Sequence, residues 1–176
     1  MARIEGSWSG MRKYLEREML APALRGRVRY NCASYVGMDG CRVFEVFLDG
    51  RLFKQFSWET VNSCFIKMGL TQKPQPMSIQ DYWRDFWPLL EKYPLSAREE
   101  YTDGEFCDAL KAYRNSDILV SLRSENPIVR MFALLDRRCG KRKLMRIKEE
   151  MDDAPEWLRE IYRLRVKEAQ RGQPVS

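Results

Sequence analysis

The chain has 176 residues, of which 44% are hydrophobic and 32% are charged, a composition typical of one globular domain with its own core. It contains no histidine, which excludes histidine-based catalytic triads, histidine-ligated zinc and switching by an unperturbed imidazole. The net charge is +6, but residues 137–148 alone hold seven basic side chains and no acid. Residues 81–110 instead carry eight acids against three bases, so opposite charges are concentrated in two segments.

The first predicted element is a helix over residues 7–20, which Pro22 ends. Residues 16–18 should face water. The apolar side chains that recur at near-helical spacing should face the core: Trp8, Met11, Leu15 and Met19.

Residues 25–56 predict a three-stranded antiparallel meander, because polar and apolar residues alternate and two glycine-containing turns divide the segment. Asp49-Gly50 is the stronger turn signal. If residues 36 and 41 lie opposite each other across the first turn, Cys32 faces Glu45. That register argues against a disulfide between Cys32 and Cys41.

Ser57 should cap a helix that ends near Met68 and covers the sheet through Trp58, Val61 and Phe65. After a polar connector, the remaining chain reads as helical. We therefore predict an α+β fold: an N-terminal helix, a three-stranded antiparallel meander and a mostly helical C-terminal half. We expect residues 1–70 and 78–176 to pack into one cooperative unit.

The helices of the second half have clear start signals. Ser78 should cap a helix that Pro88 breaks or kinks, and Thr102-x-x-Glu105 is a capping box. Later starts fall at Asp117, at Asn126-Pro127 and at Pro155. Gly140 should end one helix by adopting a positive φ. A helix over 141–151 should follow it, with these residues inward: Leu144, Ile147 and Met151.

Five cysteines occur, with wide spacing and no CxxC pair, so no zinc ribbon or thioredoxin-type site is predicted. No stretch approaches 18 apolar residues, and the N-terminus lacks the apolar run of a signal peptide. We therefore expect a cytoplasmic protein with reduced thiols, without a membrane segment, a metal or a cofactor.

The basic segment is the main candidate site. In a helix over 141–151, the cations project from the side opposite the apolar residues. Guanidinium and ammonium groups on a solvated face suit phosphate oxygens. The alternative is a solvated helix face, or pairing with the acids at 99–108. The predicted anion-binding residues are Arg137, Arg138, Lys141, Arg142, Lys143 and Arg146.

Four other features have two readings each. Asp136 is either a general base or metal ligand, or the structural partner of an arginine such as Arg130 or Arg138. Trp83 and Trp87 are either core or, with Asp136, the lining of a pocket. Cys139 is either a thiolate activated by nearby cations or an ordinary packed residue. Paired carboxylates are either a metal or acid–base site or helix caps: Asp81, Asp85 and the acids of 99–108.

Several strings, spread over most of the chain, carry a resemblance. They are NPIVRMFALLDRRCGKRKL at 126–144, the WLREIYRLR end that follows it, the start WSGMRKYLEREML with LRGRVRY, and the hairpin FLDG. Together they resemble a family of small bacterial proteins of uncharacterised function. The resemblance implies a soluble cytosolic protein and supplies no catalytic residues.

Three functional hypotheses follow. In the first, a non-enzymatic protein binds an anionic partner, nucleic acid or another polyanion, through the 137–148 segment. In the second, a protein-interaction module, such as a regulator or a toxin-neutralising partner, uses the acidic and aromatic region 81–108. The third is an enzyme that works with carboxylates or arginines and without histidine.

Overall fold

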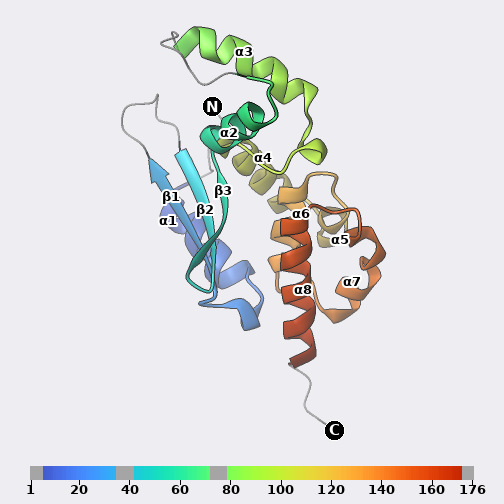
Figure 1. Ribbon diagram of the computed structural model, residues 1–176. Helices are drawn as coiled ribbons and strands as arrows, with labels where there is room; N and C mark the ends of the chain where they lie inside the picture. The colour runs from blue at the N-terminus through green and yellow to red at the C-terminus, as the bar shows by residue number, and fades with distance from the viewer. Residues whose placement is uncertain (1–5, 35–41, 72–78, 172–176) are drawn as a thin grey trace.

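The computed structural model describes residues 6–34, 42–71 and 79–171 and shows the predicted α+β fold (Figure 1). A helical N-terminal segment precedes a three-stranded sheet, and the rest is helical. The first segment consists of α1 (Trp8–Lys13), a π-helical continuation η1 (Tyr14–Met19) and a short 3-10 turn η2 (Pro22–Leu24). The strands are β1 (Val28–Ser34), β2 (Arg42–Leu48) and β3 (Arg51–Phe56).

The sheet is antiparallel with the strand order β1-β2-β3, as a meander requires. Asp49 and Gly50 both adopt positive φ, 51° and 79°, the geometry of a type I′ hairpin turn. The predicted β1–β2 register is wrong by one residue, because Cys32 lies opposite Phe44 and not Glu45. The first turn, residues 35–41, lies outside the described residues, as does Cys41. The described cysteines are free.

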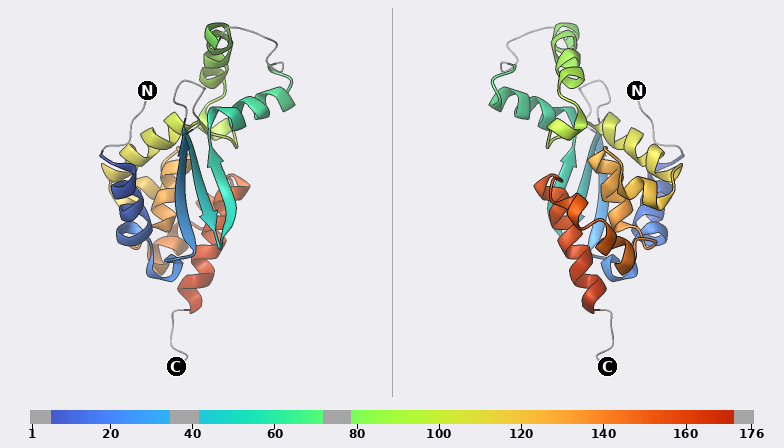
Figure 2. Two further views of the ribbon diagram at one scale, coloured as in Figure 1. Left: turned by 90° about the vertical axis from the view of Figure 1, so that its left-hand side faces the viewer. Right: turned by 90° about the vertical axis from the view of Figure 1, so that its right-hand side faces the viewer.

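One face of the sheet packs on the helices, and the other faces away from them (Figure 2). The inner face contributes Tyr30, Phe44 and Phe56 to the main core. Phe44 stacks on Phe106 of α4 (Asp103–Arg114) with ring centroids 4.5 Å apart, and the Phe106 ring lies 5.4 Å from that of Phe132 on α6 (Pro127–Leu135). Stacked and edge-on aromatic pairs of this kind therefore join the sheet to the helical half.

The helix α2 (Trp58–Lys67) begins at the predicted cap, where Ser57 Oγ accepts a hydrogen bond from the Thr60 amide. It does not cover the sheet as predicted. Val61 and Phe65 pack instead against Phe86 of α3 (Ile79–Lys92), in a second small cluster. Figure 1 shows the α2–α3 pair at one end of the molecule. The sheet is covered by α1, η1 and α4, because these elements supply apolar side chains that reach its inner face.

The remaining elements are α4 (Asp103–Arg114), α5 (Ile118–Leu122), α6 (Pro127–Leu135), α7 (Lys141–Arg146), η4 (Glu149–Met151) and α8 (Glu156–Arg171); a short 3-10 turn, η3 (Leu95–Ala97), precedes α4. The capping box at Thr102 and the Asn126 cap are both confirmed. The predicted break at Pro88 is wrong, since α3 continues to Lys92. Ser78 lies outside the described residues. None of the helices in the described part of the chain is both long and apolar enough to cross a membrane.

Candidate functional site

The basic segment forms α7 and the turn that precedes it. Gly140 is the N-cap of α7 with φ −80°, so the predicted positive φ is wrong; α6 has already ended at Leu135, and Gly140 starts the next helix. Leu144, Ile147 and Met151 are buried, as predicted. The hydroxyl of Tyr162 on α8 donates a hydrogen bond of 3.0 Å to the Leu144 carbonyl. These contacts fix which side of α7 faces solvent.

Three arginines of this segment point their charge into solvent. Arg137, Arg142 and Arg146 are exposed, and none has a carboxylate within 4.0 Å among the described residues. Lys141 is also exposed. Lys143 is half-buried, and its ammonium donates a 2.9 Å hydrogen bond to the Arg138 carbonyl. We call these five residues the basic face: Arg137, Lys141, Arg142, Lys143 and Arg146.

Arg138 behaves differently, because its guanidinium is held by the buried carboxylate of Asp136. Nη2 and Nε of Arg138 lie 2.6 and 2.9 Å from Asp136 Oδ2, and the Arg138 amide donates to Oδ1 at 2.7 Å. Asp136 is 2% exposed and also accepts the hydroxyl proton of Tyr113 in a hydrogen bond. Burial, and then Asp136, raise the pKa of Tyr113 far above its ordinary value. Asp136 therefore has the structural role, and Arg138 is its partner.

A second buried cation lies under the same turn and was missed as a site residue. Arg165 of α8 is 5% exposed, and it donates 2.7 Å hydrogen bonds to the carbonyls of Leu134 and Cys139. The Leu134 carbonyl belongs to the last turn of α6, where no intrahelical donor remains, and the Cys139 carbonyl lies in the connection to α7. Burial lowers the pKa of Arg165. The available signal was its spacing, four residues after the buried Ile161.

Cys139 is fully buried, and burial raises the pKa of its thiol to about 11. The neighbouring cations Arg165 and Lys143 oppose this shift without overcoming it. A buried neutral thiol is the opposite of an activated nucleophile. The packed reading of Cys139 is therefore the one that its environment supports.

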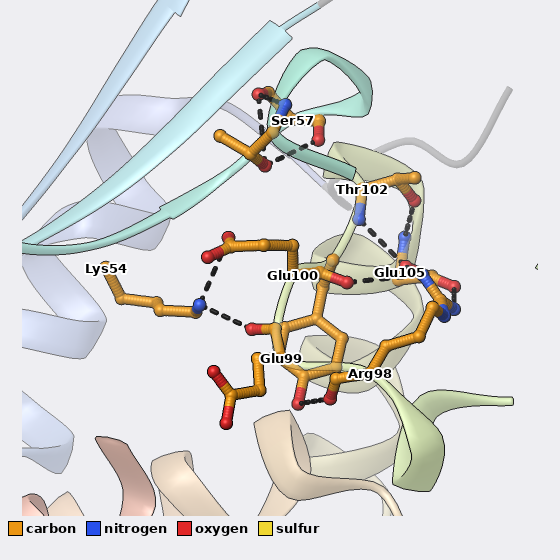
Figure 3. Close-up of polar contacts among 9 residues, drawn as sticks. Lys54, Ser57, Arg98, Glu99, Glu100, Thr102 and Glu105 are labelled. Atoms are coloured by element: carbon orange, nitrogen blue, oxygen red, sulfur yellow. Dashed lines mark hydrogen bonds and ion pairs between the residues drawn. The ribbon is translucent and has the colours of Figure 1, made fainter. Parts of the chain in front are cut away.

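Two acids of the acidic segment, Glu100 and Glu105, are bound by buried cations in one network, which begins at Lys54 of β3 (Figure 3). Lys54 is 8% exposed and lies on the inner face of the sheet. Its ammonium lies 2.5 Å from the Glu99 carbonyl and 3.1 Å from Glu100 Oε2. The rings of Tyr101 and Trp157 flank it at 5.4 and 5.5 Å, a distance suited to cation–π attraction.

Arg98 completes the network around the start of α4. Its buried guanidinium pairs with Glu105, and it donates a 2.7 Å hydrogen bond to the Tyr93 carbonyl. Glu105 in turn accepts the Thr102 amide at 2.8 Å as part of the capping box (Figure 3). The predicted alternative, pairing between these acids and the basic segment, is therefore not what the structure shows for Glu100 and Glu105.

Of the three predicted pocket residues, the two that the structure describes, Trp87 and Asp136, do not lie together. Trp87 stands on α3 and is 55% exposed, whereas Asp136 is buried at the end of α6. The side chains of Trp83 and Asp81 lie outside the described part. Asp85 is exposed and has Arg84 3.4 Å away. Across the described residues, no three Cys, Asp or Glu side chains are placed to hold a metal ion.

These features define an α+β protein in which Glu100, Glu105 and Asp136 are paired internally and the basic face is turned to solvent. The sequence model of the SF0329 protein family matches residues 7–166, and the chain belongs to this family. The match spans all the strings that carried the resemblance seen in the sequence. No curated protein and no solved structure matches the chain.

Proposed function

We propose that the basic face of the protein binds the phosphate backbone of a nucleic acid. The observation that carries this proposal is the exposure of Arg137, Arg142 and Arg146 without a carboxylate partner among the described residues. Arginines in this state keep all their donors for an external anion. Arg138 takes part less, because Asp136 already occupies most of its guanidinium.

Such a surface recognises phosphate and not base sequence. Charge-assisted hydrogen bonds to phosphate oxygens position a protein on a nucleic acid, and they release condensed counterions. One phosphate contact for each of Arg137, Arg142 and Arg146 predicts that log K falls with log salt with a slope of about −3. No step of this function requires a catalytic group.

The test is the double charge reversal Arg142→Glu/Arg146→Glu, measured by fluorescence anisotropy on a labelled 20-base-pair duplex at several salt concentrations. Losing two phosphate contacts and adding repulsion should weaken binding by at least about tenfold and flatten the salt slope by about 2. The matched control is Lys67→Glu/Lys92→Glu, which changes the net charge equally on two exposed residues of α2 and α3. Equal binding by the first variant and the wild type would discard the proposal.

A protein-interaction role remains the second candidate, because Trp87 and Met68 are exposed on the α2–α3 pair, at 55% and 49%. Exposed aromatic residues are common anchors of protein interfaces. Affinity purification with nuclease treatment separates the two candidates. A stoichiometric protein partner that survives nuclease and is lost in Trp87→Ala would favour this second role.

A further inference from the structure

We infer that the outer face of the sheet binds the unpaired bases of a single-stranded nucleic acid, with the Phe47 ring as the surface on which a base stacks. This face is turned away from the helices (Figure 2). The inference takes its class of partner from the proposed function, but it uses different residues, so either one can fail without the other.

Two neighbouring rows of side chains form this outer face, because residues alternate between the two sides of a strand. In the first row, Phe47 of β2 lies opposite Arg29 of β1 and Leu52 of β3. The second row is centred on Glu45, and beyond it Val43 is buried at 3% exposure. We call the two rows the open face: Arg29, Asn31, Glu45, Phe47, Leu52 and Gln55.

The apolar side chains of the open face are not used by the fold. Neither Phe47 nor Leu52 packs in a core cluster of the residues that the structure describes. Leu52 is 51% exposed, and Phe47 is half-buried on the central strand. Outward positions on a solvated antiparallel sheet are usually polar, so two adjacent apolar side chains there point to a binding surface.

The size of the open face argues against a second copy of the chain as the occupant. Three strands about 4.8 Å apart, with six residues of about 3.4 Å each, span roughly 300 Å². A stable protein–protein interface buries about 800 Å² on each partner. A patch of this size instead suits a few nucleotides.

The polar groups around Phe47 suit the bases of these nucleotides. The Asn31 side-chain amide donates a 2.8 Å hydrogen bond to Glu45 Oε2, which leaves the Asn31 carbonyl oxygen and Gln55 for base edges. Arg29 is exposed and has no carboxylate within 4.0 Å in the ranges described, so it can contact a phosphate. Glu45 offsets this single cation. Stacking and hydrogen bonds must therefore supply most of the affinity.

The same chemistry selects a single strand over a duplex. In a double helix the flat faces of the bases are covered by their neighbours, and the base-pairing edges are occupied. An unpaired base can turn its flat face to a ring and its edge to amide groups. The basic face contacts phosphates and does not make this distinction.

The experiment measures anisotropy of a labelled 20-nucleotide single strand and of the 20-base-pair duplex with full-length variants. Phe47→Val removes the ring but keeps a residue that favours strands. It should bind the single strand about tenfold more weakly, as loss of one stacked base does. The salt slope and duplex binding should not change, because no phosphate contact is lost.

Two matched variants accompany this test. Phe47→Tyr keeps a ring at the same position and should bind the single strand as the wild type does. Trp87→Val removes an exposed ring from α3, at the other end of the molecule, and should leave single-strand binding unchanged. Circular dichroism checks folding, and Phe47→Leu repeats the test if Phe47→Val unfolds.

The outcomes separate the two proposals. If Phe47→Val binds the single strand as tightly as the wild type, or weakens single-strand and duplex binding equally, the inference is wrong and the basic face is judged by Arg142→Glu/Arg146→Glu alone. If sedimentation shows a wild-type dimer that Phe47→Val abolishes, the open face joins two copies and the inference is overturned. If only Phe47→Val weakens single-strand binding and the charge reversal weakens neither probe, the open face stands and the basic face is wrong.

Discussion

The acidic residues near the start of α4 and the basic residues around α7 carry opposite charge at similar density, but the molecule uses them differently. Glu100 and Glu105 are bound by the buried cations Lys54 and Arg98. Arg142 and Arg146 extend into solvent from a helix whose other side is buried. The paired acids of the first segment join the sheet to the helices, whereas the exposed arginines of the second make no ion pair among the described residues.

A run of like charges in a sequence therefore does not tell whether its side chains are paired inside the fold or exposed to solvent. The outcome depends on whether a side chain of opposite charge from elsewhere in the chain lies within pairing distance. For the acids, Lys54 comes from β3, about 45 residues earlier, and for Arg138 the partner is the neighbouring Asp136. Each remaining arginine of the basic face lacks such a partner among the described residues. Three measurements of the free energy of unfolding test this contrast between paired and exposed charges.

The largest effect is expected for Arg98→Ala. This change removes a buried guanidinium, leaves the Tyr93 carbonyl without its side-chain donor and leaves Glu105 with the Thr102 amide but without its cation. It should lower the free energy of unfolding by about 3 kcal/mol, as loss of one partner of a buried pair does. Arg142→Ala should change it by less than about 0.5 kcal/mol, because that side chain is exposed. Urea unfolding of both variants checks the contrast, and equal losses would refute it.

A smaller effect is expected for Asp136→Asn, which tests the ion pair of Arg138, the paired arginine of the basic segment. An amide keeps an oxygen for the Arg138 backbone but loses the ion pair with its guanidinium. We expect a loss of about 2 kcal/mol in urea unfolding. The control is Asp153→Asn, an exposed carboxylate of the η4–α8 connection, which should be neutral. If Asp136→Asn left the free energy of unfolding unchanged, the ion pair would not stabilise the fold, and Arg138 would belong with the exposed arginines.

The smallest effect concerns the Cys139 thiol, whose pKa is raised to about 11 in the folded protein. In the unfolded chain a thiol ionises near pH 8.5, so above that pH the unfolded state gains stability and the folded state does not. Between about pH 8.5 and 9.5 the free energy of unfolding should therefore fall by about 1 kcal/mol through this group. Cys139→Ala should lose this part of the slope. An unchanged slope would show that the thiol is accessible.

Local signals in the sequence predicted the helix starts and the buried stripes. The caps at Ser57, Thr102 and Asn126 are set by a side chain and an amide two or three residues later. The hairpin at Asp49-Gly50 is equally local. The inward residues of α7 followed from helical spacing alone, although the helix ends early, at Arg146.

Two local predictions are wrong, the break at Pro88 and the positive φ of Gly140, and the other errors and omissions concern contacts between distant elements. The β1–β2 register depends on where the first turn lies, and a one-residue error there shifts every pair. The helix α2 has an apolar side that fits either the sheet or α3, so its spacing does not choose between them. Lys54 and Arg165 look like solvent-facing charges in sequence. Only the surrounding carbonyls and rings explain why they are buried.

The carboxylate of Glu16 was expected to face water, but it accepts the Tyr30 amide at 2.8 Å. Tyr30 lies on β1, an outer strand of the sheet, whose unpaired amides would otherwise invite another strand. The η1 segment lies along the β1 edge, and Glu16 occupies the Tyr30 amide, so this edge is less able to pair with a strand of another molecule. Glu16→Ala would remove this hydrogen bond and leave the Tyr30 amide open to aggregation or strand exchange between chains.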